Sequence, residues 1–321
     1  MAQTLDFKDR RIITELDKDS RQSNSKIAKA TDISKDVVNY RINRMAKEGV
    51  ITRFFAEINT AKLGFIVYKL YLQLQNTTEE DEKHILEYLY HHPRAGWTAV
   101  CSGRWDLVTA FWAKDVYEAN DYLSDFMNKF SQFILNKQTA INLQYYIYSR
   151  KWLIDDKKPQ IGCIGKRPSD EKLDNINLRI LELMGKNARM PIIEMANSLG
   201  ISSSLVIYRI KEMRKKGIIT NFRVDVNKEK LGMEFCKAFI YLQNKTTEKE
   251  NGLIRFCSLH PNVTAVTQLV GPWDLELELE TESFEQFHRI MRDIKNRFPG
   301  LVRSYESVLI SKESGIRYIP K

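Results

Sequence analysis

Apolar residues recur at helical spacing near the start of the chain. Ile12 and Leu16 are four residues apart, and Val38, Ile42 and Met45 follow an i, i+4, i+7 pattern. Asp6 and Ser34 stand where helix N-caps are needed, and Gly49 follows the last apolar residue of the second pattern. The pattern predicts a first helix, a short second helix and a third helix over residues 35–48.

The second and third predicted helices are separated by the tight turn "TDIS", and the third is followed by the strand-like run "VITRFFAEI". Helices joined by so short a turn are typical of a helix-turn-helix, with the strand as a wing. We therefore expect residues 1–60 to form a winged helix-turn-helix domain. Its third helix buries one stripe and leaves the opposite face free for the DNA major groove.

Strand and helix patterns alternate after residue 60. "FIVYKLYLQLQ" predicts a strand, "EEDEKHILEYLYHH" a helix, "WTAVCSG" and "DLVTAFWA" a hairpin, "DVYEANDYLSDFMNKF" a helix and "LNKQTAINLQYYIY" a last strand. The order βαββαβ over residues 61–148 predicts a ferredoxin-like sandwich with both helices on one face of the sheet. The other face carries Tyr71, Val108 and Phe111, so we expect it to pair with a second sheet.

The whole unit is repeated 168 residues later. "YRINRMAKEGVITRFFAEINTAKLG" (40–64) aligns without a gap with "YRIKEMRKKGIITNFRVDVNKEKLG" (208–232), and 13 of these 25 positions are identical. The repeat predicts a second winged helix-turn-helix over residues 173–229 and a second βαββαβ sandwich over residues 230–321. Residues 149–172, rich in Pro, Gly and charge, are expected to be a linker. The predicted fold class is α+β, with two winged helix-turn-helix domains and two ferredoxin-like sandwiches in tandem.

These motifs resemble the Lrp/AsnC, or feast/famine, family of transcription regulators. The resemblance is carried by "VVNYRINRMAKEGVI" in the third helix and by the hairpin turns "SGRWDL" and "VGPWDL". It implies sequence-specific binding of double-stranded DNA and a small effector, with an amino acid the usual class. Family members usually hold one such unit and dimerise through the sandwich, so this chain resembles a dimer fused into one polypeptide. We expect its two sandwiches to pack on each other, and such pseudo-dimers to associate further.

Polar side chains off the buried stripe are the candidate DNA contacts, because Lys, Arg and Asn pair with base edges or hold phosphates. The candidates are Lys35, Asn39, Tyr40, Arg41, Asn43, Arg44, Arg21 and Arg53 in the first copy, and Ser203, Ser204, Tyr208, Arg209, Lys211 and Arg189 in the second. An ordinary solvated helix face is the alternative for the helix residues. Salt bridges to nearby acids explain Arg21, Arg189, Arg41 and Arg209 equally well.

The two copies differ at several positions of the third helix, and Leu205 stands where Val37 stands in the first copy. Ile207 and Glu212 stand in the second copy where Asn39 and Arg44 stand in the first. An apolar and an acidic side chain are poor partners for DNA, so the second helix is predicted to be the weaker reader. An effector-binding protein with weakened DNA binding is the corresponding alternative function.

The hairpin turns are the candidate effector site, because the family resemblance places a small ligand beside this loop. The residues are Ser102, Gly103, Trp105, Asp106, Gly271, Trp273 and Asp274. An acid beside backbone amides can hold an α-amino group and a carboxylate. The sequence supports a purely structural role equally well, in which the glycine allows a tight turn and the tryptophan packs in the core.

Positive charge is concentrated where phosphates would be met. The chain carries a net charge of +9 and a pI near 9.2, and residues 1–60 hold 12 basic and 9 acidic residues while 170–230 hold 12 and 8. The first sandwich is net negative and the second neutral. This distribution favours a polyanionic partner for the helix-turn-helix domains.

Other functions have weaker support in the sequence. The four cysteines lack metal-ligand spacing, no segment is suited to a signal peptide or a membrane span, and neither a metal nor a cofactor is expected. We therefore expect a soluble, cytoplasmic protein. Siroheme decarboxylases resemble the same family and also occur as fused pairs, but their His-Asn-Tyr and Trp-Phe-Thr segments are absent here. The sequence thus predicts a protein that is not an enzyme.

Overall fold

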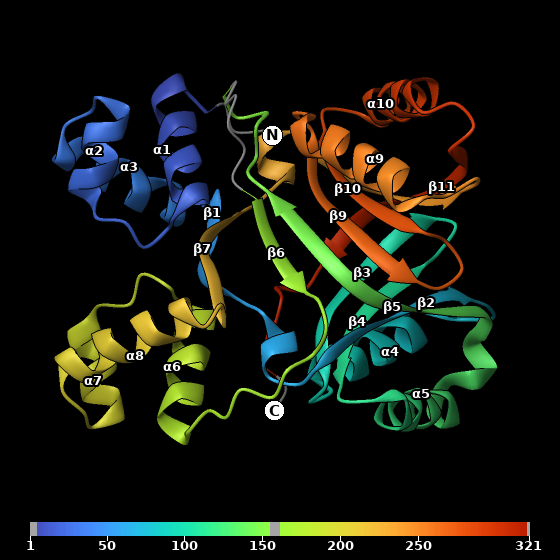
Figure 1. The fold of residues 1–321 in the computed structure, drawn as a ribbon, viewed down its shortest axis with the longest axis horizontal. Coiled ribbons are helices and arrows are strands. Elements are labelled where there is room, and N and C mark those ends of the chain that lie inside the picture. Colours follow the sequence, from blue (N-terminus) through green and yellow to red (C-terminus); the bar gives the residue numbers. More distant parts are fainter. Residues whose placement is uncertain (1–4, 155–160, 320–321) are drawn as a thin grey trace.

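The computed structural model describes residues 5–154 and 161–319. Two helical domains, here called the heads, lie side by side at one end of the molecule, and two sheets with outer helices fill the other end (Figure 1). The first head consists of α1 (Phe7–Lys18), α2 (Asn24–Thr31) and α3 (Lys35–Lys47). The second consists of α6 (Asn175–Lys186), α7 (Ile192–Leu199) and α8 (Ser203–Lys215).

Local chemistry sets the ends of the head helices. The side chains of Asp6 and Ser34 accept hydrogen bonds from the backbone amides of Asp9 and Val37, so both predicted N-caps are confirmed. The turn before the third helix requires a left-handed residue, which is Asp32 in the first head and Gly200 in the second, with φ of 53° and 67°. The helix-turn-helix geometry therefore follows from short-range signals.

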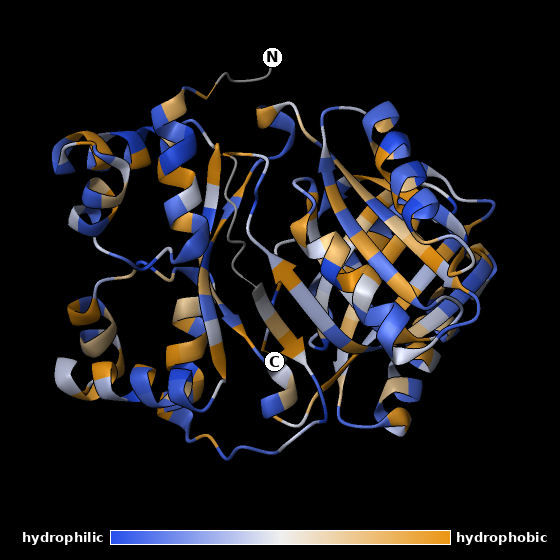
Figure 2. Cartoon of the chain, turned by 45° about the horizontal axis from the view of Figure 1, so that its top comes forward, coloured by the Kyte–Doolittle hydropathy of each residue, from blue (hydrophilic) through white to orange (hydrophobic). Residues whose placement is uncertain are grey.

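The strand after each third helix pairs with its counterpart in the other copy. β1 (Ile51–Ile58) and β7 (Ile219–Val226) form a two-stranded antiparallel sheet between the heads. Phe55 and Ile58 of β1 pack in the core of the second head, whereas Val224 and Val226 of β7 pack in the core of the first. Figure 2 shows the hydrophobic segments of these strands between the heads and the sandwiches. Each strand thus completes the core of the opposite head.

Each sandwich has the predicted order βαββαβ, and the predicted fold class is confirmed. The first contains β2 (Ile66–Leu74), α4 (Glu79–His91), β3 (Ala95–Gly103), β4 (Leu107–Ala113), α5 (Val116–Phe130) and β5 (Ile134–Tyr148). The second contains β8 (Glu234–Leu242), α9 (Thr247–Leu259), β9 (Val263–Val270), β10 (Leu275–Thr281), α10 (Phe284–Arg297) and β11 (Val302–Glu313). Three 3-10 turns complete the described elements: η1 (Thr60–Lys62), η2 (Ser131–Phe133) and η3 (Glu229–Leu231).

The two sheets pack face to face and join at both edges, which confirms the expected pairing within one chain. Tyr71 and Val108 lie on the shared face as predicted. The placement of Phe111 there was wrong, because its ring packs on the helix-covered face, 4.1 Å from the ring centroid of Tyr122 in α5. β3 pairs with β11 of the other copy, and the long strand β5 pairs with β2 along its first half and with β9 along its second. Tyr71, Trp105, Phe239 and Trp273 are fully buried between the sheets. The ring centroids of Tyr71 and Trp273 are 4.6 Å apart, in an edge-to-face arrangement that aromatic pairs favour.

A buried ion-pair network lies within the same interface. Lys69 of β2 donates to Glu276 of β10, and Lys237 of β8 lies 2.8 Å from Glu278 of β10. Burial alone raises the pKa of a carboxyl group, but Lys69 and Lys237 hold the pKa of Glu276 below its usual value. The two cations and two anions compensate one another, as buried charges must.

The segment assigned to the linker contributes a strand. β6 (Ile161–Gly165) pairs antiparallel with the second half of β5. Beyond it, the amides of Ser169 and Glu171 donate to the carbonyl oxygens of Ala61 and Lys62 at 2.8 and 2.9 Å. The linker segment 161–171 is therefore fixed to η1 on one side and to β5 on the other. In the described ranges, none of the helices is long and apolar enough to span a bilayer.

Candidate nucleic-acid interface

The third helix of each head has one buried stripe and one exposed face. Val38, Ile42 and Met45 are buried in the first head. The opposite face exposes Lys35, Asn39, Tyr40 and Asn43 in α3, and Ser204, Tyr208 and Lys211 in α8, while Ser203 is half-buried. Tyr40 and Tyr208 stand at corresponding positions and are 65% and 57% exposed. Each head therefore offers one polar helix face with a projecting aromatic ring.

Two arginines of α3 are held by acids of α1. Arg41 Nη1 lies 2.7 Å from Asp6 Oδ2 and 2.9 Å from Asp9 Oδ1, and Arg44 Nη2 lies 2.6 Å from Asp9 Oδ2. The hydrogen bond to Asp6 raises the pKa of Arg41 above its usual value. These ion pairs orient the recognition helix on α1, so any contact of Arg41 or Arg44 with DNA competes with them.

The second head keeps one of these pairs and has lost the other. Arg209 pairs with Asp174, which repeats the pairing of Arg41 with Asp6. The counterparts of Asp9 and Arg44 are Asn177 and Glu212. The ion pair of Arg44 with Asp9 therefore has no counterpart in the second head. Glu212 thus differs from Arg44 in two respects, the missing ion pair to the first helix and the charge on the DNA-facing surface.

Asn39 is linked to the other head through a chain of hydrogen bonds. Its Oδ1 accepts from Asn24 Nδ2 at 3.0 Å, and Asn24 Oδ1 accepts from Arg189 Nη2 at 2.7 Å. The predicted base-reading residue of the first head is thus positioned partly by a residue of the second.

Arg21 and Arg189 bridge the two heads reciprocally. Arg21 Nη1 donates to the carbonyl oxygens of Ala188 and Met190, and Arg189 Nη1 donates to those of Ser20 and Gln22. Burial lowers the pKa of both guanidinium groups. Each arginine donates to two carbonyl groups of the opposite head, so bridging the heads is a sufficient structural role for both side chains. That they contact DNA phosphates stays a prediction.

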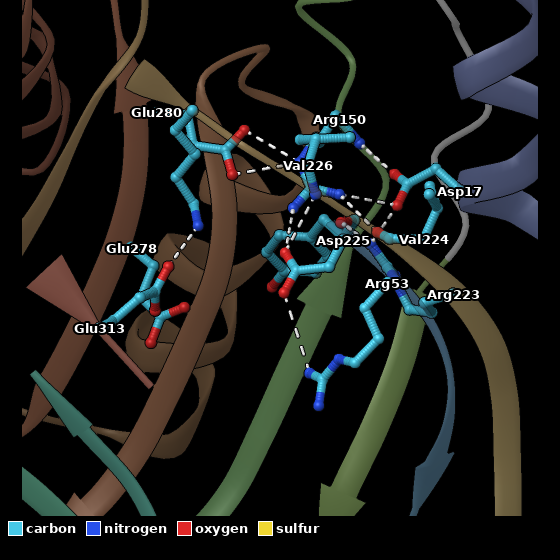
Figure 3. Close-up of polar contacts among 12 residues, drawn as sticks. Asp17, Arg53, Arg150, Arg223, Val224, Asp225, Val226, Glu278, Glu280 and Glu313 are labelled. Atoms are coloured by element: carbon cyan, nitrogen blue, oxygen red, sulfur yellow. Dashed lines mark hydrogen bonds and ion pairs between the residues drawn. The ribbon is translucent and has the colours of Figure 1, made fainter. Parts of the chain in front are cut away.

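Arg53 lies on the side of the heads that faces the sandwiches. Its Nη2 lies 3.8 Å from Asp225 (Figure 3). Its Nη1 donates to the carbonyl oxygen of Ile316 at 3.0 Å, and its guanidinium lies 4.5 Å from the ring centroid of Phe55. This position ties the strand β1 to the C-terminal segment.

A buried polar cluster joins the first head to the second sandwich. Arg150 lies 3.0 Å from Asp17 of α1 and 3.1 Å from Glu280 of β10, and Arg223 of β7 lies 2.9 Å from Asp17 (Figure 3). Burial alone would lower the pKa of Arg150, but Glu280 and Asp17 raise it above its usual value. The cluster fixes the head on the sandwich through three elements distant in sequence.

The sequence contains a signal for this cluster in the differences between the two copies. Asp17, Arg150 and Glu280 have Gly185, Tyr318 and Trp112 as counterparts in the other copy. Positions that are charged in one copy and apolar in the other mark places where the two copies have taken different structural roles.

The hairpin residues proposed for the effector lie at the interface between the sheets. Trp105 and Trp273 are buried with their ring centroids 6.4 Å apart. The carboxylates of Asp106 and Asp274 accept hydrogen bonds from the backbone amides of Leu74 and Leu242, each at 2.7 Å. The acids therefore already bind amides of the preceding strands; their effector role stays a prediction.

The glycines and the serine of these turns lie at close approaches of the backbone. A Cβ on Gly103 would lie 2.7 Å from the Ser307 carbonyl oxygen, and one on Gly271 would lie 2.8 Å from the Ala140 Cβ. Ser102 is in register with Leu309 of β11.

Among the described residues, no group of three or more His, Cys, Asp or Glu side chains could hold a metal ion.

Comparison with known proteins supports the helix-turn-helix assignment in both copies. A family model for the winged helix-turn-helix DNA-binding domain matches residues 5–52 and 173–220. An uncharacterized HTH-type transcriptional regulator of Pyrococcus horikoshii is 33% identical over 127 residues, which are 38% of this chain and 83% of the relative. The transcriptional regulator FL11 of Pyrococcus furiosus is 29% identical over 139 residues, 42% of this chain and 83% of the relative. The regulatory protein AsnC of Haemophilus influenzae is 27% identical over 119 residues, covering 37% and 79%.

Among solved structures, a match extends along nearly the whole chain. The siroheme decarboxylase NirDL has a TM-score of 0.65 and 11% identity, and the alignment covers 98% of this chain and 94% of that one. At this identity the match shows a shared fold alone.

This match contradicts the prediction that the chain is not an enzyme, because an enzyme has the same arrangement of all four domains. The prediction rested on two short segments that are absent here, and on a sequence in which no nucleophile–base pair, Gly-rich phosphate loop or carboxylate pair stands out. A few side chains determine an active site, whereas a whole core determines a fold, so missing motifs do not exclude catalysis on this scaffold.

The bridging role of the arginines can be separated from DNA contact by measuring stability without DNA. Arg21→Ala or Arg189→Ala should lower the free energy of unfolding in urea by about 1.5–3 kcal/mol, because hydrogen bonds from a charged donor to buried carbonyls are lost. Arg10→Ala, on the exposed face of α1, is the control and should change it by less than about 0.5 kcal/mol. Unchanged stability of Arg21→Ala would contradict the bridging role.

Proposed function

This chain belongs to the Lrp/AsnC family of transcription regulators, and on that premise we propose that it binds specific double-stranded DNA through two linked heads and responds to a small effector. The observation that carries the proposal is the pair of exposed third-helix faces on heads that are joined into one block. Net positive charge on both heads supports the same partner, because phosphate contacts supply much of the affinity of such proteins for DNA.

The geometry supports a fixed spacing between the two recognition helices. The ladder between β1 and β7 and the reciprocal bonds of Arg21 and Arg189 join the heads within one chain. Dimeric helix-turn-helix proteins place two such helices in successive major grooves, and the spacing of the half-sites follows from the protein. We propose that this chain does so as a pseudo-dimer.

The two heads are proposed to read different half-sites. Lys35, Asn39 and Asn43 are exposed on α3, and amide and ammonium groups pair with base edges. Ile207, at the position of Asn39, is 54% exposed on α8 and offers apolar contact alone. An imperfectly palindromic site matches this difference.

We propose an amino acid as the effector class, on the family membership. The contact residues proposed for it are the turn residues Ser102, Gly103, Trp105 and Asp106 and their counterparts Gly271, Trp273 and Asp274. Access to them requires the turns at the edges of the two sheets to open toward a ligand or a second chain. Association of pseudo-dimers through these turns is part of the same proposal.

Binding to a random-sequence duplex should be sensitive to salt. The logarithm of the affinity should fall linearly with the logarithm of the salt concentration, with a slope of about −0.9 for each phosphate contact. Gel-shift titrations at several salt concentrations measure the slope. A flat dependence would refute DNA binding through the basic heads.

Matched substitutions in the two third helices test the asymmetry. On a selected target site, Asn39→Ala and Asn43→Ala should each weaken binding by about 1–3 kcal/mol if the amides contact bases. Ile207→Ala, at the position of Asn39, should change it by less than about 0.5 kcal/mol. Lys83→Ala, on the exposed surface of α4, is the control for nonspecific charge loss. Equal losses from both heads would contradict the asymmetry.

A catalytic role is the second candidate, favoured by the fold that the chain shares with a siroheme decarboxylase along its whole length. A solved structure of that enzyme contains an iron-uroporphyrin III analogue. If this chain acts on a tetrapyrrole, adding it to iron-uroporphyrin should shift the absorbance spectrum until about one pigment per chain is bound. A spectrum that does not change with added protein would count against this candidate.

A further inference from the structure

Two clefts of similar volume lie beside the sandwiches, and each is lined by residues of both copies. The first cleft, of about 560 Å³, is bordered by η1, the start of β2, the middle of β5 and the end of β6. The second cleft, of about 550 Å³, is bordered by the segment around Lys228, the start of β8 and the end of β11. Residues such as Ile66 and Glu234, which line the two clefts, differ by 168 in number. The clefts therefore occupy corresponding places in the two copies.

The linings of the two clefts have diverged in polarity. Ala61 and Ile66 line the first cleft where Glu229 and Glu234 line the second, whereas Glu313 borders both. Trp97 and Trp112 add two further aromatic side chains to the first cleft. Apolar and aromatic walls with few polar groups are typical of sites for small organic molecules, whereas carboxylates favour water and cations.

The charges on the inner wall of the first cleft are paired within the protein. Lys237 lies 2.8 Å from Glu278, and Lys69 donates to Glu276. Glu313 accepts hydrogen bonds from Lys228 and from Trp97 Nε1. A ligand that enters the cleft thus meets a wall that is aromatic and electrically compensated.

Linker residues 164–168 cover the first cleft, whereas none of the linker residues that the structure describes lines the second. Gly165 donates to Asn59 Oδ1 at 3.1 Å, Lys166 donates through its amide to the Leu143 carbonyl oxygen at 2.8 Å, and Ser169 donates to the Ala61 carbonyl oxygen at 2.8 Å. These bonds hold the segment across the cleft from β5 to η1. Its side chains therefore have defined positions at the entrance.

Two cations stand at this entrance. Lys166 and Arg167 line the cleft and are exposed, and neither forms a side-chain ion pair within the part of the chain that the structure describes. The nearby acids are already engaged, because Asp170 pairs with Lys172 and Glu171 lies 3.3 Å from Lys216. The entrance therefore attracts an anionic group.

We infer that the first cleft binds a small aromatic organic anion. Its ring system lies among Trp97, Trp112 and Tyr145, and its carboxylate, sulfonate or phosphate group meets Lys166 and Arg167. Aromatic walls supply apolar area and edge-to-face contacts, and a guanidinium forms strong charge-assisted hydrogen bonds with oxyanions. The site is separate from the hairpin turns and does not depend on DNA binding.

A pair of fluorescent probes that differ by a single anionic group tests both parts of this inference. 1-Anilinonaphthalene-8-sulfonate is the anion, and N-phenyl-1-naphthylamine has the same rings without the sulfonate. Titrated into the full chain without DNA, the sulfonate should bind at one site per chain with a blue-shifted emission. Its affinity should exceed that of the neutral probe by about tenfold or more, because the entrance cations favour the anion.

Variants of the chain locate the site. The double substitution Lys166→Gln, Arg167→Gln should weaken the sulfonate probe by about tenfold and leave the neutral probe unchanged. Ile66→Glu gives the first cleft the residue of the second and should abolish binding of both probes, with circular dichroism to show that the fold is kept. Lys312→Gln removes an exposed cation from the second cleft and is the matched control, with unchanged affinity expected.

Sulfonate binding that survives Ile66→Glu in the folded protein would overturn the location of the site. Equal affinity of the two probes, or equal weakening of both by the double substitution, would overturn the anion preference. Because these titrations contain no DNA, their failure is distinguishable from a failure of the gel-shift experiments.

Discussion

Strands β1 and β7 determine how the rest of the molecule is arranged. A two-stranded ladder is barely stable in water by itself, and each of these strands has an apolar face that its own head does not cover. Crossing between the heads solves both problems, because Phe55 and Ile58 of β1 enter the core of the second head while Val224 and Val226 of β7 enter that of the first. Neither head has a complete core without the other copy. The heads are consequently one structural block, and the positions of both third helices follow from a single ladder.

Duplication then allowed the two copies to specialise at the junction between the heads and the sandwiches. On one side, Asp17, Arg150 and Glu280 form a buried ionic cluster. The corresponding positions on the other side are Gly185, Tyr318 and Trp112, which carry no charge. There Tyr318 stacks on Phe55, and Trp112 donates to the Arg317 carbonyl oxygen. A symmetric dimer of identical chains must place the same side chain in both positions. One polypeptide with two copies is free of that constraint, and the different linings of the two clefts are a consequence of the same freedom.

Periodicity and the repeat predicted the architecture, and the reason is that the relevant signals are local. The caps at Asp6 and Ser34, the left-handed turn at Asp32 and the alternation in the sheets act over a few residues. The crossing of β1 and β7 was not predicted. The pattern of apolar residues in a wing strand is the same whether the strand packs on its own head or on the other one. The hydrogen-bond acceptors of Arg21 and Arg189 could not be predicted from the sequence either. They are backbone carbonyl groups, which every residue type has. Salt bridges were the alternative for all four arginines. The structure shows acids at Arg41 and Arg209. For Arg21 and Arg189 that alternative is wrong, because their guanidinium groups donate to carbonyl oxygens of the opposite head.

The position of the first cleft relates ligand binding to the arrangement of the heads. Its wall includes Thr60 and Ala61 of η1, which follows β1 in the chain, and its cover is bonded to the same turn through Ser169. A ligand changes a conformational equilibrium only by as much as it prefers one state over another. A ligand that binds only while the linker segment lies across the cleft favours the observed position of that segment. It thereby favours the observed positions of η1 and of the end of β1. The end of β1 is part of the core of the second head, where Phe55 and Ile58 pack with residues of α6. Stabilising this end therefore stabilises the second head, whose third helix has fewer side chains that can pair with bases. The first head contacts the start of β1 through Ile51 and is held otherwise by β7 and the ionic cluster. The end of β1 that lies next to the cleft therefore bears more directly on the second head than on the first.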